Sequence, residues 1–145
     1  MTANVTISCD IASTDYSCPL GFEIRLDGET ILDIGSVTGP SHAEFATSDA
    51  DGEHELEFIL KNKRPEHTQI DENNEIIKDA NIIVANVEFD GIPLGQVLTR
   101  LTEYHHDFNG TSNAVVEKFY GEMGCNGTVS LNFSTPIYLW LLENV

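Results

Sequence analysis

The sequence predicts an all-β protein, a jelly-roll-like β-sandwich of the carbohydrate-binding-module type, with residues 1–145 forming one domain. Three observations support this prediction. Apolar and polar residues alternate in many short segments, turn signals bound those segments, and about eight or nine such segments follow one another at regular spacing. With 145 residues and 41% hydrophobic composition, the chain is long enough to bury one substantial core.

The first hairpin is predicted from local pattern. Residues 4–9 alternate and are rich in β-branched side chains, which favours a strand. Residues 22–26 place Phe, Ile and Leu on one face and Glu and Arg on the other, as in a half-buried antiparallel strand. Asp27-Gly28 is a strong tight-turn signal, so residues 30–37 are expected to form the return strand.

Three further strands are expected over 42–47, 54–60 and 82–89, where apolar or β-branched residues dominate. Residues 61–80 between them form a long polar stretch, which we expect to be a functional or mobile loop. The predicted core includes Phe22, Ile24, Leu26, Leu56, Phe58, Ile82, Val84, Val129 and Leu131.

The C-terminal third contains one ambiguous segment and one unusual one. Residues 95–105 fit a helical stripe and a strand equally well, whereas 128–133 alternate as a strand. The run 137–142 is the most apolar segment, and as a strand it would be apolar on both faces. Such a strand needs cover on both sides, either from the loop 95–108 or from another subunit. We therefore predict a homo-oligomer, or docking to a larger partner, through the face formed by Tyr138, Trp140 and Leu142.

Charge and motif content exclude several classes of function. Twenty-four acidic residues oppose seven basic ones, and the net charge of −17 would repel nucleic acid. No apolar run is long enough for a membrane span, and the N-terminus has neither the basic start nor the apolar stretch of a signal peptide. The sequence has no GxSxG, P-loop or GxGxxG motif, and a non-catalytic protein is expected.

The cysteines and histidines do not indicate a zinc site. The three cysteines have no CxxC spacing, and their odd number leaves at least one unpaired, so buried free thiols are expected. No HExxH motif is present, and the adjacent His105 and His106 would point to opposite faces of a strand. Clustered carboxylates leave calcium as the metal to consider.

Several segments together resemble a known family. One strand ends in Asp27-Gly28, a second contains Gly52-x-His54 and ends at Asn62, and a third follows Asp79-x-Asn81 and ends at Gly91. In this pattern the chain resembles a calcium-dependent carbohydrate-binding module of the xylan-binding type, over roughly the middle half of its length. The resemblance implies a jelly-roll sandwich that binds a glycan with the help of calcium.

The resemblance also implies site residues. It assigns Asn62, Asp79 and Asn81 to carbohydrate binding and Asp79 to the ion. Separately from the resemblance, Asp71, Glu72 and Glu75 lie in the same polar stretch and could substitute as metal ligands. Lys63, however, stands where the family has an acid, and Ala85 replaces another. A lysine at a cation site is an electrostatic objection to calcium, and a solvated acidic loop is the alternative.

Aromatic side chains complete the predicted glycan site. Tyr104, Phe108 and Tyr120 flank a polar loop at 105–113, and we select Tyr104 and Tyr120 as rings for sugar binding. Trp140 lies in the apolar C-terminal run. We therefore expect its ring to be buried in the core and not to form a platform for sugar stacking.

Two functions fit these observations. The first is a non-catalytic structural or adhesion component of a phage virion, such as a tail, baseplate, fibre or decoration protein, made in the host cytoplasm and associated with other virion proteins. The alternative is an extracellular, calcium-assisted carbohydrate-binding protein that recognises a cell-surface glycan. An acid-dependent glycosidase ranks third, because so many acids make any single pair uninformative.

Overall fold

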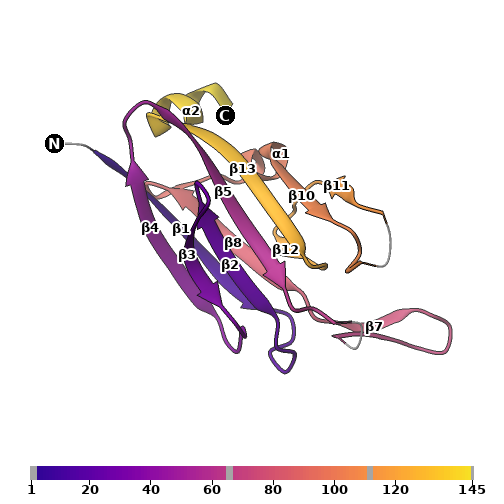
Figure 1. Cartoon of the computed structure of the whole chain (residues 1–145). Helices are drawn as coiled ribbons and strands as arrows, with labels where there is room; N and C mark the ends of the chain where they lie inside the picture. The colour runs from indigo at the N-terminus through magenta and orange to yellow at the C-terminus, as the bar shows by residue number, and fades with distance from the viewer. Residues whose placement is uncertain (1–2, 65–66, 111–112, 145) are drawn as a thin grey trace.

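The computed structural model describes residues 3–64, 67–110 and 113–144 and contains two antiparallel sheets packed face to face (Figure 1). The first sheet has the order β12-β8-β1-β4, with β9 paired to β8. Its strands are β1 (Asn4–Ser13), β4 (Ser41–Ser48), β8 (Ile82–Phe89), β9 (Ile92–Pro93) and β12 (Glu122–Met123).

The second sheet has the order β11-β10-β13-β5-β2-β3. Its strands are β2 (Gly21–Leu26), β3 (Glu29–Ile34), β5 (Gly52–Lys61), β10 (Thr102–His106), β11 (Val115–Glu117) and β13 (Gly127–Thr135). The longest pairing joins β13 to β5 over nine registered residue pairs, from Gly127 with Leu60 to Thr135 with Gly52. These two sheets confirm the predicted β-sandwich.

The core lies between the sheets, where inward-facing residues of both meet. Every residue predicted for the core is buried, with at most 6% of its surface exposed. The alternation within each strand therefore identified the inward face correctly. The predicted turn is also confirmed, because Asp27 and Gly28 have positive φ values of 53° and 83° between β2 and β3.

The polar stretch 61–80 differs from the expected loop, because it contains a two-stranded hairpin. Strands β6 (Thr68–Ile70) and β7 (Ile76–Asp79) pair antiparallel, and the hairpin extends beyond the ends of the main sheets (Figure 1). At its base, Thr68 Oγ1 donates to Asp79 Oδ1 at 2.6 Å, and the Ala80 amide donates to the His67 carbonyl at 3.0 Å. The hairpin is thus fixed to the sandwich at its base.

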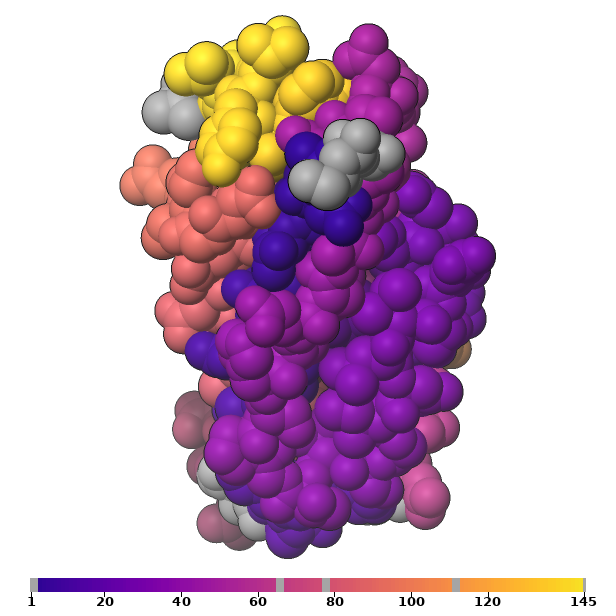
Figure 2. Space-filling view, turned by 90° about the vertical axis from the view of Figure 1, so that its left-hand side faces the viewer, coloured from indigo at the N-terminus to yellow at the C-terminus, as the bar shows by residue number. Residues whose placement is uncertain are grey.

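The prediction of a C-terminal strand is wrong: residues Ile137–Asn144 form helix α2. Figure 2 shows α2, in yellow, lying over one end of the sandwich. Residues Ile137, Trp140 and Leu141 face the core, and the Trp140 ring lies 5.9 Å from that of Phe89. The spacing i, i+3, i+4 buries one side of a helix, so the run needs cover on one side only.

The face predicted from Tyr138, Trp140 and Leu142 consequently does not exist, because Trp140 is buried while Tyr138 and Leu142 are exposed. The burial expected for Trp140 is confirmed. The ambiguous segment 95–105 contains both alternatives in succession, helix α1 (Gln96–Leu101) followed directly by β10.

Two further predictions concern the state of the cysteines and a membrane span. The three cysteines form no disulfide with one another; Cys9 is buried, whereas Cys18, whose thiol donates to Asp15 Oδ2 at 3.4 Å, and Cys125 are partly exposed. Burial raises the pKa of the Cys9 thiol to about 12, so this side chain stays a neutral thiol. In the described part of the chain, no helix has the length and apolar content that crossing a membrane requires.

Candidate functional site

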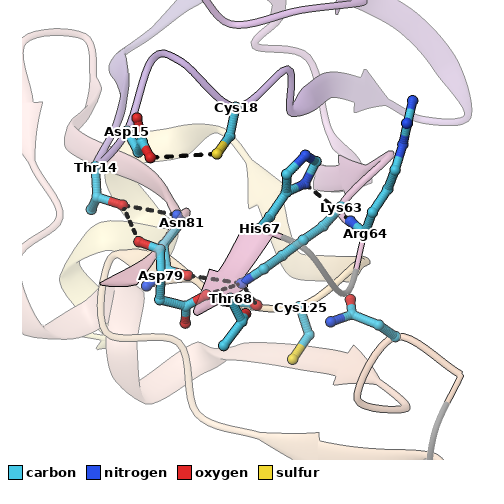
Figure 3. Close-up of polar contacts among 12 residues, drawn as sticks. Thr14, Asp15, Cys18, Lys63, Arg64, His67, Thr68, Asp79, Asn81 and Cys125 are labelled. Atoms are coloured by element: carbon cyan, nitrogen blue, oxygen red, sulfur yellow. Dashed lines mark hydrogen bonds and ion pairs between the residues drawn. The ribbon is translucent and has the colours of Figure 1, made fainter. Parts of the chain in front are cut away.

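A buried lysine lies at the end of β5. Asn62, directly after the strand, adopts a left-handed conformation with a φ of 67°, and the next residue, Lys63, has a side chain that is only 1% exposed (Figure 3). Lysine is almost never fully buried unless its charge is paired. The partners of this ammonium group therefore define the site.

The Lys63 ammonium contacts three oxygens from two separate segments, one around Asp79 and Asn81 and one at Gly124. Nζ donates to Asp79 Oδ1 at 2.7 Å, to Asn81 Oδ1 at 3.1 Å and to the Gly124 carbonyl at 2.5 Å. An ammonium group has three hydrogens to donate, so all of them are used. We call Lys63, Asp79, Asn81 and Gly124 the Lys63 site.

The backbone of Lys63 is held as firmly as its side chain. The amide of Lys63 donates to Asn126 Oδ1 at 2.8 Å, and Asn126 Nδ2 donates back to the Lys63 carbonyl at 2.9 Å. The amide of Asn126 in turn donates to Asn109 Oδ1 at 2.7 Å. These bonds tie the end of β5 to the turn that precedes β13.

The anionic side of the Lys63 site is fixed by neighbouring hydroxyl and amide groups. Thr14 Oγ1 donates to the Asp79 carbonyl at 2.9 Å and accepts from the Asn81 amide at 2.9 Å. Asn81 Nδ2 donates to Glu122 Oε1 at 2.7 Å. Asp79 and Asn81 are therefore each held in place from a second direction (Figure 3).

These residues do not fit a calcium ion. Calcium needs six to eight oxygens, and here an ammonium already lies within hydrogen-bond distance of the available ones. Across residues 3–64, 67–110 and 113–144, no group of three or more His, Cys, Asp or Glu side chains is placed to hold a metal. The structure thus does not assemble the predicted ligand set of Asp71, Glu72 and Asp79.

Asp71 and Glu72 lie instead in the turn of the β6–β7 hairpin. Asp71 Oδ1 accepts from the amides of Asn73 and Glu75 at 2.8 and 3.0 Å, so its carboxylate closes the turn. Asp79 is at the opposite end of β7, next to Thr68. The three acids are therefore divided between the tip and the base of one hairpin.

A cleft with aromatic walls adjoins the Lys63 site. Its volume is about 550 Å³, and we call it the aromatic cleft; it is lined by Tyr104, His106, Phe108, Glu117, Lys118, Tyr120, Glu122, Gly124 and Cys125. Two of its rings face solvent, because Tyr120 is 77% exposed and Phe108 is 41% exposed. Gly124 belongs to both the cleft and the Lys63 site.

A buried histidine organises the cleft. The His106 side chain is 2% exposed, and its Nε2 lies 2.7 Å from Glu117 Oε2 on the neighbouring strand β11. Its Nδ1 accepts from the Phe108 amide at 3.3 Å, and the His106 and Phe108 rings pack edge to face at 4.8 Å. His106 therefore positions one carboxylate and one exposed ring. As expected for adjacent strand residues, His105 faces the other way and is exposed.

The two predicted sugar-binding tyrosines have different surroundings. Tyr104 is 5% exposed, its hydroxyl donates to the Cys125 carbonyl, and the Cys125 amide donates to that hydroxyl at 2.9 Å. Burial raises the pKa of Tyr104, which keeps the hydroxyl protonated for this bond. Tyr104 thus supports the cleft floor, whereas Tyr120 exposes its ring.

A second cavity, of about 600 Å³, surrounds His54 and Trp140 at the opposite end of the second sheet. His54 Nδ1 lies 2.7 Å from Asp27 Oδ2, and its Nε2 lies 3.1 Å from Thr135 Oγ1, so its ring joins the β2–β3 turn to the end of β13. The aromatic rings of this cavity, Phe133 and Trp140, are buried. The cavity therefore has no exposed aromatic ring on which a ligand could stack.

Comparison with known proteins identifies solved structures with a similar fold. No family model and no curated protein sequence matches the chain. A similar solved structure is the selenomethionine form of vCBM60, described in connection with a circular permutation that links two families of calcium-dependent carbohydrate-binding modules. It is 12% identical, with a TM-score of 0.53, and the match covers 89% of this chain and 90% of that one.

A second similar structure is vCBM60 in complex with galactobiose, at 12% identity and a TM-score of 0.48, with 88% of this chain and 98% of that chain covered. At such identity the likeness concerns architecture. The chain therefore has the β-sandwich fold of a calcium-dependent carbohydrate-binding module, as its sequence predicted. In its Lys63 site, the lysine ammonium donates hydrogen bonds to the oxygens of Asp79, Asn81 and Gly124.

Proposed function

We propose that this protein is a non-catalytic carbohydrate-binding protein and that its ligand lies in the aromatic cleft. The observation that carries the proposal is the exposed Tyr120 ring in a cleft that also contains Glu117 and Glu122. The C–H face of a sugar ring is apolar enough to pack on an aromatic face, while sugar hydroxyls donate to carboxylates. This cleft offers both kinds of contact.

The fold supports the same proposal from a separate direction. The similar structure with a TM-score above 0.5 is a carbohydrate-binding module, and such modules bind sugars without cleaving them. Because one fold can host many functions, the similar fold alone does not identify a ligand site. The side chains of the aromatic cleft are therefore the main support for the proposal. In this proposal Asp79 and Asn81 act behind the cleft wall, where they hold Lys63, while Asn62, the residue before Lys63, is exposed.

Titration calorimetry with xylan- and galactan-derived oligosaccharides tests the proposal. Tyr120→Ala should weaken binding roughly tenfold or more, since loss of a stacking ring removes about 1.4 kcal/mol or more of contact. Tyr16→Ala, which removes a partly exposed tyrosine outside the cleft, is the matched control and should bind like the native protein. Undiminished binding by the Tyr120 variant, or no binding of any oligosaccharide by the native protein, would contradict the proposal.

The virion role, the origin in a host cytoplasm and the homo-oligomer stay predictions, because no described contact and no similar structure bears on them. Because the predicted strand face does not exist, self-association would have to use the outer side of α2, where Tyr138, Leu139 and Leu142 are exposed. Sedimentation of the intact chain measures its oligomeric state directly. A monomer at high concentration would rule out self-association through this helix.

A further inference from the structure

We propose that the Lys63 ammonium is the resident cation of this protein, and that it fixes the wall of the aromatic cleft so that neither folding nor the shape of the cleft requires calcium. The role in folding is independent of any ligand. The role in shaping the cleft rests on the proposed function where it concerns glycan binding. Both follow from the contacts of one side chain.

Lys63 joins segments that lie far apart in the sequence. Its three acceptors lie 16, 18 and 61 residues further along the chain. Asp79 ends β7, Asn81 directly precedes β8, and Gly124 lies before β13, so the acceptors are a carboxylate, a side-chain amide and a main-chain carbonyl. A cation that gathers these oxygens does what a bound metal ion does in a loop-rich site, but it is attached to the chain.

The Lys63 side chain is closed off from water, which limits the access of any other cation to its oxygens. The Lys63 side chain is 1% exposed, and the Asp79 side chain that pairs with it is 26% exposed. A divalent ion could reach these oxygens only if the ammonium left, and the ammonium would then lose all three of its hydrogen bonds. Breaking a buried pair is costly because it leaves a charge without a partner in a medium of low dielectric constant. Calcium and Lys63 therefore exclude one another at this place.

The Lys63 site is connected to the aromatic cleft. Gly124, whose carbonyl binds the ammonium, lines the aromatic cleft together with Glu122 and Cys125. Glu122 is held through Asn81, which is itself a partner of Lys63. The same cation thus fixes the segment from Glu122 to Cys125 from behind, so Lys63 is a positioning residue for the cleft.

Calcium itself gives the first test, which needs no variant. The melting temperature of the native protein should be the same, within about 1 °C, in millimolar calcium chloride and in excess chelator, because a ligand raises it only by binding the folded state. Calorimetric titration with calcium chloride alone should give no binding heat. A calcium-dependent rise in melting temperature would overturn the proposal even if every variant failed to fold.

The second test compares two lysines. Lys63→Met keeps the length of the side chain and removes its charge, and it should lower the melting temperature by roughly 10 °C. Lys61→Met removes a lysine two residues earlier, whose side chain is 33% exposed, and should lower it by only a few degrees. Adding Asp79→Asn to Lys63→Met should restore part of the loss, because it removes the stranded carboxylate. Equal melting of the two lysine variants would overturn the proposal.

The third test concerns the cleft wall and is independent of any glycan. Amide hydrogen exchange at residues 124–126 should be faster in Lys63→Met than in the native protein and unchanged in Lys61→Met. If exchange at these amides is the same in both variants, Lys63 does not position the wall. Absence of glycan binding by the native protein would count against the proposed function alone, since the melting and exchange results do not involve a ligand.

Discussion

Lys61 and Lys63 are two residues apart, and each pairs with an aspartate at 2.7 Å, but their surroundings are opposite. Lys61 Nζ contacts Asp33 Oδ1 and, at 3.3 Å, Glu23 Oε1, and a third of its side chain is open to water. Lys63 Nζ is closed off among three oxygens, which belong to Asp79 at the hairpin base, Asn81 just before β8 and Gly124. The chain thus contains a surface ion pair and a buried one, side by side in sequence.

The difference shows that distance alone does not measure what an ion pair contributes. Water can solvate Lys61 when its partner is removed, and exposed pairs of this type contribute about 0–1 kcal/mol. Water does not reach Lys63, so removing either partner leaves an uncompensated charge. The hydrogen bond to Asp33 nevertheless raises the pKa of Lys61, which keeps it charged throughout the ordinary pH range.

The core beneath both lysines sets the scale for this comparison. Phe58 lies on β5 with 1% exposure, and its ring is 6.2 Å from Phe22 and 6.4 Å from Phe119. Phe58→Ala should lower the free energy of unfolding by about 3–5 kcal/mol, since it leaves a cavity that neighbours fill only in part. Urea denaturation measures this loss. A value below about 1 kcal/mol would show that packing around β5 contributes less than we infer.

Double-mutant cycles separate the two ion pairs directly. We expect a coupling free energy of about 1–3 kcal/mol between Lys63 and Asp79, from Lys63→Met, Asp79→Asn and the combined variant. The cycle for Lys61 and Asp33, built with the same substitutions, should give less than about 0.5 kcal/mol. Similar coupling in both cycles would remove the distinction between the two sites.

Salt should sharpen the same contrast with a smaller effect. Raising sodium chloride from about 0.1 M to 1 M shortens the Debye length from about 10 Å to 3 Å and screens charges that face water. The coupling between Lys61 and Asp33 should fall toward zero, while that between Lys63 and Asp79 should stay constant. The measurement repeats both cycles at the two salt concentrations, and a parallel decline would indicate that water reaches Lys63.

Acid should weaken the surface ion pairs around Lys61 by protonating Glu23, which is one of its partners. Hydrogen bonds from Arg25 and Thr30 lower the pKa of Glu23 from 4.5 to about 2. A carboxylate with a depressed folded-state pKa stabilises the folded protein fully above 4.5, and this contribution is lost as the pH falls toward 2. Glu23→Gln should therefore flatten the dependence of stability on pH within this window. Denaturation curves between pH 5 and pH 2 check the expected slope.

Much of the fold could be read from the sequence, because alternation in a strand determines which side chains face inward. The hairpin turn at Asp27-Gly28 is equally local, since it requires only residues that tolerate a positive φ. Helix α2 was missed because a short apolar run has no single period: Ile137, Trp140 and Leu141 fit a helix, while the same run also fits a strand apolar on both faces.

The candidate site was harder to predict for a physical reason. Charge identified Lys63 as an obstacle to calcium, but its partners lie up to 61 residues away, and no local pattern reveals where a lysine side chain ends. His106 was assigned to the opposite face from His105, which is correct, yet its pairing with Glu117 depends on the register of β10 and β11. Alternation along a strand thus predicts which face a side chain occupies. The partner of that side chain depends on which strands pair and in which register, and this cannot be read from local sequence.

The β6–β7 hairpin has a practical consequence for protein engineering. Its base is anchored by Thr68 and Asp79, and its turn is closed internally by Asp71, so the two ends of the hairpin are stabilised independently. Residues 72–74 form an exposed tip beyond the ends of the sheets (Figure 1). An exposed tip of this kind tolerates insertion, and a short peptide grafted there would be displayed on a stalk without rebuilding the sandwich.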